Sequence, residues 1–412
     1  MISNGLPQEA YVWIWLPNAT EPVVAGLLSK QNNTLLFNYG KSYLERTNAI
    51  PIYDPELPLK AGELPLLNDL SMPNCIRDAS PDAWGRRVLL YRSGNKNAAQ
   101  LELDELTCLL ESGSDRIGAL NFQLSPTEYV PRLGAHVPLD ELMESAERVQ
   151  QGLPISNALN QALQHGTSIG GTRPKVMIEI GNKKYIAKFS SSTDSYNVVK
   201  AEYIAMRLAR LVGIDAAPVK LENTMGKDVL LVERFDRIKT AKGWQRKPMV
   251  SALTILGLGE MQARYASYED LADIVRSRFT DSGNTLRELF SRIVFNILCG
   301  NTDDHARNHA AFWNGSYLTL TPAYDICPQS RIGNEASQAM LISGQNRMSQ
   351  LSVCMQTAHK FQLSANDAQS IIEHQKQGIN ENWEKVCDEA KLSSVERGQL
   401  MGRQFLNPFI SW

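Results

Sequence analysis

The hydrophobic periodicity of this 412-residue chain changes near residue 250, and this change constrains the fold more than any other feature. Between residues 166 and 237 apolar side chains alternate as they do in strands, and a tight turn at Gly181 and Asn182 joins two such segments into a β-hairpin. After residue 250 apolar residues recur at helical spacing, in a stripe that stops at Gly300. The sequence therefore predicts a β-rich lobe followed by a helical lobe.

The segment before the hairpin has a mixed character. Strand-like stretches, AYVWIWL and TLLFNY, are followed by the helical stretches DAWGRRVLLYR and LDELTCLLE. Ser80, Pro81 and Asp82 form a typical helix N-terminus before the first of these helices. The proline-rich stretch SPTEYVPRLGAHVP then indicates a connection. We therefore expect an α+β protein with a small N-terminal mixed α/β domain and a two-lobed core. The expected bounds are 1–125 for the domain, 126–245 for the β-rich lobe and 246–412 for the helical lobe.

The composition excludes some classes of function. The net charge is -2, from 42 Lys and Arg against 44 Asp and Glu, so no bulk positive field attracts nucleic acid or anionic membranes. No apolar run approaches the roughly 20 residues of a membrane-spanning helix, and the first residues lack the pattern of a secretory signal. None of the six Cys residues stands in a C-x-x-C pair, which argues for reduced thiols. We expect a cytoplasmic protein with no membrane contact.

The stretch HGTSIGGTRPK, residues 165–175, leads directly into the first strand of the hairpin. Its glycines would let backbone N–H groups approach phosphate oxygens. The stretch is not a Walker A motif, because Thr and Arg follow Gly171, and on its own a flexible loop is the simpler interpretation. Lys188 on the returning strand could pair with phosphates beneath this loop, and Glu202 on the next helix is placed to hold Lys188. Taken singly, each charge could equally be a solvated surface group.

The stretch GNTDDHARNHAAF, residues 300–312, follows the apolar helix and precedes a second hairpin, HAAFWNGSYLTL. Phosphoryl transfer from ATP needs a carboxylate near the acceptor hydroxyl, and oxygen ligands that hold magnesium. Asp303, Asn308 and Asp325 supply this set, and the Asp-x-x-x-x-Asn spacing equals that of the protein-kinase catalytic loop. No His-Arg precedes Asp303, and Ile-Cys rather than Phe-Gly follows Asp325. The order of these groups predicts a protein-kinase-like core that uses ATP and magnesium.

His305 and His309 allow a different interpretation of the same loop. Their i, i+4 spacing would suit zinc if the loop were helical. Gly, Asn and Asp at the start of the loop, and the lack of a Glu directly after the first His, argue against a helix. We instead expect His305 to hydrogen-bond within the loop and His309 to begin a strand.

Five segments resemble, in sequence and in order, the motifs of the HipA family, which are bacterial serine/threonine kinases that act as toxins of toxin–antitoxin pairs: TSIGGTRPK, YIAKF, LLVERFDR, NTDDHARNHAAF and LTPAYDI. IRDASPDAWGRRVL and SDRIGAL resemble the family's N-terminal region, so the resemblance covers most of the chain. It implies Asp303 as the catalytic residue and Asn308 and Asp325 as magnesium ligands. It places Glu233 and Phe235 in the adenine-binding hinge and Asp236 at the ribose. The ATP-binding residues that it implies are Ser168, Ile169, Gly170, Gly171, Lys188, Glu233, Phe235, Asp236, His305, Asn308 and Asp325.

The resemblance also implies a function. The γ-phosphate of ATP would pass to a Ser or Thr of a cellular protein, with an aminoacyl-tRNA synthetase as a candidate target and growth arrest as the result. A HipB-like helix-turn-helix antitoxin would be the partner, DNA would be reached only through that partner, and Ser168 would be a regulatory autophosphorylation site. Two alternatives stay open. One is a HipA-like pseudokinase that senses nucleotide as a co-repressor, and the other is a metal-dependent phosphohydrolase.

Overall fold

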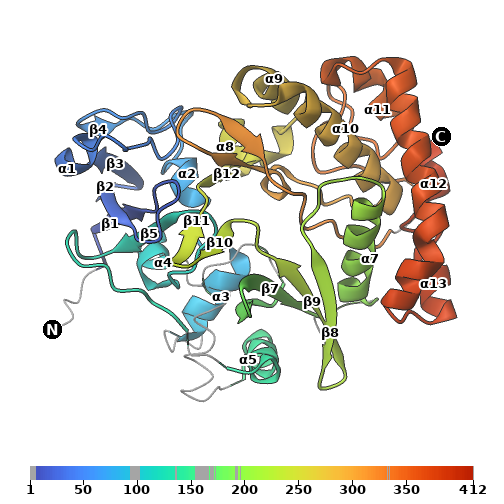
Figure 1. The fold of residues 1–412 in the computed structure, drawn as a ribbon, viewed down its shortest axis with the longest axis horizontal. Coiled ribbons are helices and arrows are strands. Elements are labelled where there is room, and N and C mark those ends of the chain that lie inside the picture. The colour runs from blue at the N-terminus through green and yellow to red at the C-terminus, as the bar shows by residue number, and fades with distance from the viewer. Residues whose placement is uncertain are drawn as a thin grey trace.

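The computed structural model arranges the chain from the N-terminal sheet at one end of the molecule to the orange and red helices at the other (Figure 1). The green strands and helix α7 lie between them. Among the described residues, no helix combines the length and the hydropathy that a membrane span requires. The residues that the structure describes are 6–92, 103–134, 137–153, 167, 171, 173–190, 194, 196–331, 333 and 335–411.

An antiparallel sheet with the strand order β4-β3-β2-β1-β5 forms the centre of the N-terminal domain. The predictions for this region are confirmed, because AYVWIWL and TLLFNY supply β1 and β3 and the two helical stretches form α3 and α4. Helix α4 begins after Asp104, whose side chain accepts a hydrogen bond from the N–H of Thr107. The elements are β1 (Glu9–Ile14), β2 (Val23–Gln31), β3 (Thr34–Tyr39), α1 (Lys41–Leu44), β4 (Glu63–Leu64), α2 (Asn74–Arg77), α3 (Ala83–Arg92), α4 (Glu105–Glu111) and β5 (Leu120–Gln123).

A second antiparallel sheet, with the strand order β6-β7-β9-β8, forms the β-rich lobe and is covered on both faces. Strand β9 shows this, since Val229 and Leu231 pack in a cluster with α3 and α5, whereas Leu230 and Val232 belong to the main core, which includes α7. Helix α3 therefore lies on this sheet, although it precedes the predicted boundary at residue 125. The elements are α5 (Leu139–Gln151), β6 (Lys175–Ile180), β7 (Lys183–Phe189), α7 (Val198–Leu211), β8 (Val219–Thr224) and β9 (Lys227–Glu233).

The helical lobe surrounds α10, whose apolar stripe is buried as the sequence predicts. Three short strands, β12, β13 and β14, form a sheet at its edge, and the last two are the predicted second hairpin. The elements that follow β9 along the chain are β10 (Arg237–Thr240), β11 (Gly243–Arg246), β12 (Met249–Ser251), α8 (Ala252–Ile255), η2 (Glu260–Tyr265), α9 (Tyr268–Arg278), α10 (Ser282–Cys299), η3 (Ala306–Asn308), β13 (Ala310–Trp313), β14 (Leu318–Leu320), α11 (Leu351–Thr357), η4 (Ala358–Phe361), α12 (Ala365–Glu389), α13 (Ser394–Leu400) and η5 (Pro408–Ser411).

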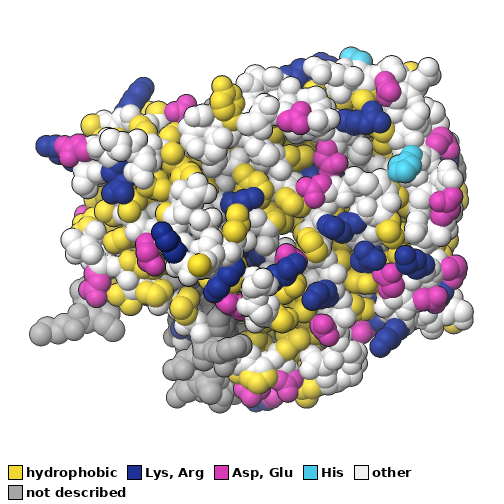
Figure 2. All heavy atoms as spheres, in the orientation of Figure 1, with side chains coloured by type: hydrophobic (Ala, Val, Ile, Leu, Met, Phe, Trp, Pro, Cys, Tyr) yellow, Lys and Arg dark blue, Asp and Glu magenta, His cyan; other side chains and the backbone are white. Residues whose placement is uncertain are grey.

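The face of the molecule drawn in Figure 2 carries acidic and basic side chains that are interspersed over the helical lobe. This face therefore presents no continuous field of one sign, in keeping with the net charge of -2.

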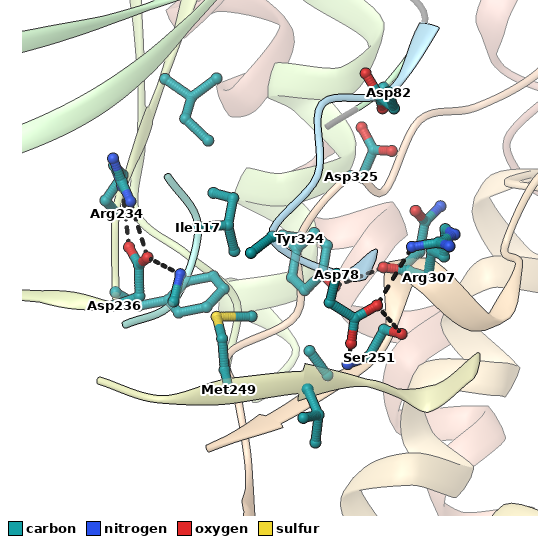
Figure 3. Close-up of a pocket in the computed structure, with 18 of the residues that line it drawn as sticks. Asp78, Asp82, Ile117, Arg234, Asp236, Met249, Ser251, Arg307, Tyr324 and Asp325 are labelled. Atoms are coloured by element: carbon teal, nitrogen blue, oxygen red, sulfur yellow. Dashed lines mark hydrogen bonds and ion pairs between the residues drawn. The ribbon is translucent and has the colours of Figure 1, made fainter. Parts of the chain in front are cut away.

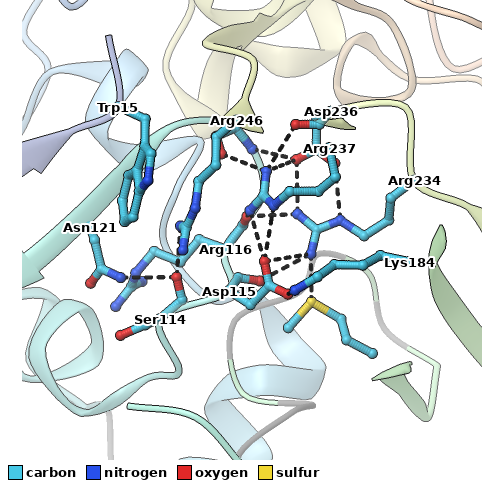
Figure 4. Close-up of polar contacts among 12 residues, drawn as sticks. Trp15, Ser114, Asp115, Arg116, Asn121, Lys184, Arg234, Asp236, Arg237 and Arg246 are labelled. Atoms are coloured by element: carbon cyan, nitrogen blue, oxygen red, sulfur yellow. Dashed lines mark hydrogen bonds and ion pairs between the residues drawn. The ribbon is translucent and has the colours of Figure 1, made fainter. Parts of the chain in front are cut away.

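A buried ionic network joins the N-terminal domain to the β-rich lobe (Figure 4). Its first centre is Asp115, which lies just before β5. The Asp115 carboxylate accepts hydrogen bonds from Lys184 Nζ at 2.6 Å and from Arg237 Nη2 at 2.9 Å, and Arg234 Nη1 lies 3.1 Å away. Burial alone would raise the pKa of Asp115, but these three cations hold it well below its usual range. The carboxylate is therefore ionised, and it ties three basic side chains to the N-terminal domain.

The second centre of this network is Asp236, which follows the end of β9. Its Oδ2 accepts from Arg234 Nη2, from Arg237 Nη1 and from the N–H of Gly118, each at 2.8 Å. Burial would raise the pKa of Asp236, but Arg234 and Arg237 outweigh it and lower the pKa to about 2. The segment after β9 is thus fixed from outside the two-lobed core.

We predict that replacing Asp236 by Asn lowers the free energy of unfolding at pH 7 by about 3–5 kcal/mol, since Arg234 and Arg237 would be left as buried charges without this carboxylate. A carboxylate with a lowered pKa in the folded state stabilises the fold above its unfolded pKa of about 3.9, and this contribution is lost as the pH falls through about 2. The difference between the two proteins should therefore shrink over that interval. Urea unfolding at several pH values measures it, with Glu128→Gln, an exposed acid, as the control. A difference that stays constant down to pH 2 would contradict the assignment.

A second prediction concerns Gly300, which ends α10 in the left-handed conformation with φ 69°. A Cβ at this position would stand 2.6 Å from the carbonyl oxygen of Gln404. Gly300→Ala should therefore destabilise the protein by about 1–3 kcal/mol. Gly283→Ala is the matched control within the same helix, because nothing lies within 4 Å of its Cβ position and alanine favours a helix. Thermal unfolding should show a lower midpoint for the first variant and an unchanged or higher one for the second.

Candidate active site

A cavity of about 350 Å³ lies where the N-terminal domain and the two lobes meet (Figure 3). Its walls come from the segment between α2 and α3, from the β6–β7 hairpin, from the residues after β9, from the loop before β13 and from the segment after β14. The structure thus brings most of the predicted site to one place. The predicted residues that line the cavity are Gly171, Lys188, Glu233, Phe235, Asp236, His305, Asn308 and Asp325.

Lys188 lies at the centre of the site and contacts two carboxylates. Its Nζ donates to Glu202 Oε1 at 2.5 Å, as the sequence predicts, and it also pairs with Oδ1 of Asp325. Burial alone would lower the pKa of Lys188, but Asp325 and Glu202 outweigh it and raise the pKa above its usual range. Desolvation would raise the pKa of Asp325, yet Lys188 lowers it far below the ordinary value. The ammonium and Asp325 are therefore charged at neutral pH.

Asp325 takes the left-handed backbone conformation, with φ 58°, directly after the residue that fastens this segment to the loop before β13. That residue is Tyr324, whose hydroxyl donates to the carbonyl oxygen of Arg307 at 2.7 Å. The ring of Tyr324 also lies 5.6 Å from the ring of Phe235, centre to centre. These contacts set the position from which the Asp325 carboxylate meets Lys188.

The loop after Gly300 is held by Asp304, the second member of its Asp pair. The Asp304 carboxylate is buried, accepts from Asn296 Nδ2 at 2.6 Å, lies 3.0 Å from His309 Nε2 and pairs with the hydroxyl of Tyr268. Burial would raise the pKa of Asp304, but His309 outweighs it and lowers the pKa. Asp304 is thus a structural carboxylate that fastens the loop to α9 and α10.

Asp303 differs from its neighbour because it is exposed. Desolvation raises the pKa of Asp303, and the Asp325 carboxylate raises it further, while His305 lowers it. Asn308 is buried at the cavity wall, where its Nδ2 donates to the backbone oxygen of Asp303 at 3.1 Å. The loop therefore holds the Asn308 amide close to Asp303, a residue whose carboxyl group has a raised pKa.

The zinc interpretation of this loop finds no support in its geometry. The Nε2 atom of His309 already pairs with the Asp304 carboxylate. His309 directly precedes β13, close to the strand start that we expected there. His305 makes loop hydrogen bonds through its backbone, whereas its buried Nδ1 has no partner among the described residues. Within the described part of the chain, no group of three or more His, Cys, Asp or Glu side chains could hold a metal ion.

The segment after β9 forms the wall that the sequence predicts as the adenine-binding hinge. Glu233 and Phe235 both line the cavity, and Glu233 Oε2 accepts from Lys183 Nζ at 2.7 Å on the outer side. Asp236 lines it too, but its carboxylate already accepts from Arg234, Arg237 and the N–H of Gly118. A ribose contact by Asp236 stays a prediction, and it would have to share the carboxylate with these donors.

The glycine-rich stretch is described at its two ends only. Thr167 is fully buried and its Oγ1 accepts from the N–H of Gly113 at 2.8 Å. Gly171 has φ 101°, a backbone conformation that favours glycine, and the point where a Cβ would stand lies 1.9 Å from Lys175 Nζ. Three predicted ATP-binding residues lie outside the described residues: Ser168, Ile169 and Gly170.

Sequence reasoning missed several residues of the cavity wall. Lys175 lines it from β6, and Asp78 and Asp82 reach it from the N-terminal domain. Asp78 accepts from the N–H of Ser251 at 2.7 Å and lies 3.3 Å from Arg307 Nη1, as the dashed lines of Figure 3 show. Burial raises the pKa of Asp82 to about 7. The available signal was the pair of aspartates in IRDASPDAWG, a stretch to which we assigned a helix N-terminus and a family resemblance but no role in the site.

The oxygen donors of the site fit a hard divalent cation. Asn308 and Asp325 line the same cavity, and an amide oxygen with a carboxylate suits magnesium next to phosphates. The lowered pKa of Asp325 keeps it in the anionic form that a cation needs. These two residues would hold magnesium together with the phosphate oxygens of a nucleotide.

Comparison with known families identifies both parts of the chain. The model of the HipA-like C-terminal domain matches residues 167–383, which is more than half of the chain, and the model of the HipA N-terminal domain matches residues 16–123. The protein Y4mE of Sinorhizobium fredii, which is named as a kinase, is 25% identical over 337 residues, or 74% of each chain. The serine/threonine-protein kinase toxin HipA of Shewanella oneidensis is 26% identical over 244 residues, which cover 52% of this chain and 54% of that protein.

A solved structure shows the same fold. A chain from the Shewanella oneidensis MR-1 complex of HipA, HipB and operator DNA matches with a TM-score of 0.66 at 19% identity, covering 94% of this chain and 97% of that chain. The predicted kinase-like two-lobed architecture is thereby confirmed. With family models that match its N-terminal and C-terminal parts, the chain belongs to the HipA family.

Proposed function

We propose that the chain is an ATP- and magnesium-dependent serine/threonine-protein kinase of the HipA toxin type. The observation that carries this proposal is the contact of Lys188 with Glu202 and with Asp325, in a cavity that Asn308 also lines. The side chain of Asn308 donates to the backbone oxygen of Asp303, which comes from the same loop. A lysine fixed by a helix carboxylate and an aspartate that holds magnesium are the parts that protein kinases use to position a triphosphate.

Each residue of the proposed site would have a role in this reaction. Glu202 directs Lys188 toward the phosphates, and the backbone of Glu233 and Phe235 would hold the adenine. Asp303 would accept the proton of the acceptor hydroxyl, a task that its raised pKa suits. Bound magnesium would neutralise charge on the phosphate oxygens. Residues 78–83, between α2 and α3, would exclude water from the phosphate end of the cavity.

The substrate and the partner are proposed from the family. We infer a Ser or Thr of a cellular protein as the acceptor, with an aminoacyl-tRNA synthetase as the candidate whose loss of activity would arrest growth. We also infer a HipB-type antitoxin, through which the chain would reach DNA. The support for the antitoxin is that the matching Shewanella oneidensis structure contains HipB and operator DNA. Phosphoproteomics of cells that express the chain, against cells with Asp303→Asn, tests the substrate.

Two variants test the division of roles within the site. Asp303→Asn should lower phosphoryl transfer by about 10²-fold or more while ATP affinity stays unchanged, because this carboxylate faces the acceptor rather than the nucleotide. Asp325→Asn should instead weaken the binding of Mg-ATP, since it removes an anionic metal ligand. Calorimetric titration and transfer of labelled phosphate measure both.

Equal losses of affinity in the two variants would contradict the assignment, and release of free phosphate without phosphoprotein would favour a phosphohydrolase. No turnover by the wild type despite ATP binding would favour a pseudokinase.

A further prediction is that Ser168 is an autophosphorylation site that switches the kinase off. Thr167 is the neighbouring acceptor, but it is fully buried and its hydroxyl oxygen accepts from the N–H of Gly113, which favours Ser168. A phosphate brings roughly two negative charges, which ATP's own phosphates would repel. Phosphopeptide mapping should find phosphate at Ser168 in the wild type and not in Asp303→Asn, and Ser168→Asp should be less active. An unmodified Ser168 in a chain that phosphorylates another protein would refute this prediction.

A further inference from the structure

The wall of the nucleotide cavity includes a segment of the N-terminal domain, residues 78–83, between α2 and α3. This segment is fixed at both ends. Asp78 accepts from the N–H and the hydroxyl of Ser251 at 2.7 and 2.8 Å. Just after the segment, Trp84 donates from Nε1 to the carbonyl oxygen of Lys175 at 2.9 Å, and from its N–H to the carbonyl oxygen of Gly171 at 3.2 Å. The side chain of Asp82 is therefore held between two anchored positions.

The β6–β7 hairpin carries two lysines in paired positions. Lys175 on β6 lies directly opposite Lys188 on β7, and cross-strand partners share one face of a sheet. Both side chains line the cavity. Glu202 orients Lys188, as shown above. Burial lowers the pKa of Lys175, and the carboxylate that counters this most strongly is Asp82.

The position of Asp82 fits the same task. The point where a Cβ on Gly171 would stand is 1.9 Å from Lys175 Nζ and 4.0 Å from Asp82 Oδ2, so the ammonium and the carboxylate converge on one small space. Oδ1 of Asp82 is buried and has no hydrogen-bond partner among the described residues. Figure 3 shows Asp82, on the light-blue N-terminal segment, next to Asp325. In its ionised form, a carboxylate placed there acts on a phosphate only through a cation, because alone it would repel the phosphate.

We propose that Asp82 is a positioning residue of the nucleotide site, which attracts the Lys175 ammonium to the phosphate end of the cavity through its charge, whereas Glu202 holds Lys188 by direct contact. The inference rests on the proposed function, and it makes the N-terminal domain part of the ATP site.

Asp82→Asn keeps the shape of the side chain and removes its charge. ATP affinity, measured by calorimetry on the full chain, should fall about tenfold, because the ammonium loses the group that directs it. Affinity for adenosine should stay unchanged, since adenosine has no phosphate. Asp69→Asn, an exposed aspartate of the same domain, is the matched control and should bind both ligands like the wild type. Equal losses for ATP and adenosine would show a general disturbance of the cavity and overturn the proposal.

A double-mutant cycle separates positioning from a merely structural role. In a Lys175→Met background, adding Asp82→Asn should leave ATP affinity unchanged or raise it. Without the Lys175 ammonium, the Asp82 carboxylate would only repel phosphate. The same loss in both backgrounds would overturn the proposal.

Titration of ATP in the presence of EDTA tests whether Asp82 acts through magnesium. The loss in Asp82→Asn should persist without magnesium, because the role runs through Lys175. A loss seen only with magnesium would make Asp82 a metal ligand and overturn the positioning role. A wild-type chain that binds adenosine and ATP equally weakly would instead count against the proposed function itself, and the positioning role would fall with it.

Discussion

The contacts of one ammonium group with two carboxylates hold the site together. Glu202 comes from α7 and Asp325 from the segment after β14, and two carboxylates at one site repel each other unless a cation lies between them. Lys188 supplies that cation from β7 and contacts both. The seating of α7 on the sheet and the place of Asp325 at the cavity thus depend on the same charge. On the proposed function, the same arrangement would also present a lysine and an anionic oxygen ligand to a triphosphate.

The N-terminal domain is a structural part of the core rather than a separate module. Its helix α3 covers the sheet of the β-rich lobe, and the network around Asp115 and Asp236 fixes the residues after β9. A buried carboxylate with two arginines is stable only while all partners are present. The hinge that would hold adenine is therefore set by contacts outside the two lobes, and any partner that moves the N-terminal domain would act on the nucleotide cavity.

Sequence patterns predicted those parts of the site that depend on local structure. The hairpin, the end of α10 at Gly300 and the Asp-x-x-x-x-Asn spacing were all visible, because periodicity and spacing report on single elements. Helix α5 was missed, since its segment followed a proline-rich connection. Lys175 and Asp82 were missed for a different reason. They lie near each other only because α3 packs on the sheet, and no local pattern states which distant segment covers a strand.

The adjacent residues Asp303 and Asp304 show how one short loop can do two tasks. Asp304 turns inward, where Asn296 and Tyr268 donate to it and His309 lowers its pKa. Asp303 stays exposed, with a raised pKa. The difference arises from environment alone, because the two side chains are identical. A carboxylate that must take up a proton at a defined place needs a rigid support, and here its own neighbour in the chain supplies the anchor. On the proposed function, the polar composition of the loop corresponds to a catalytic group together with the residues that keep it in place.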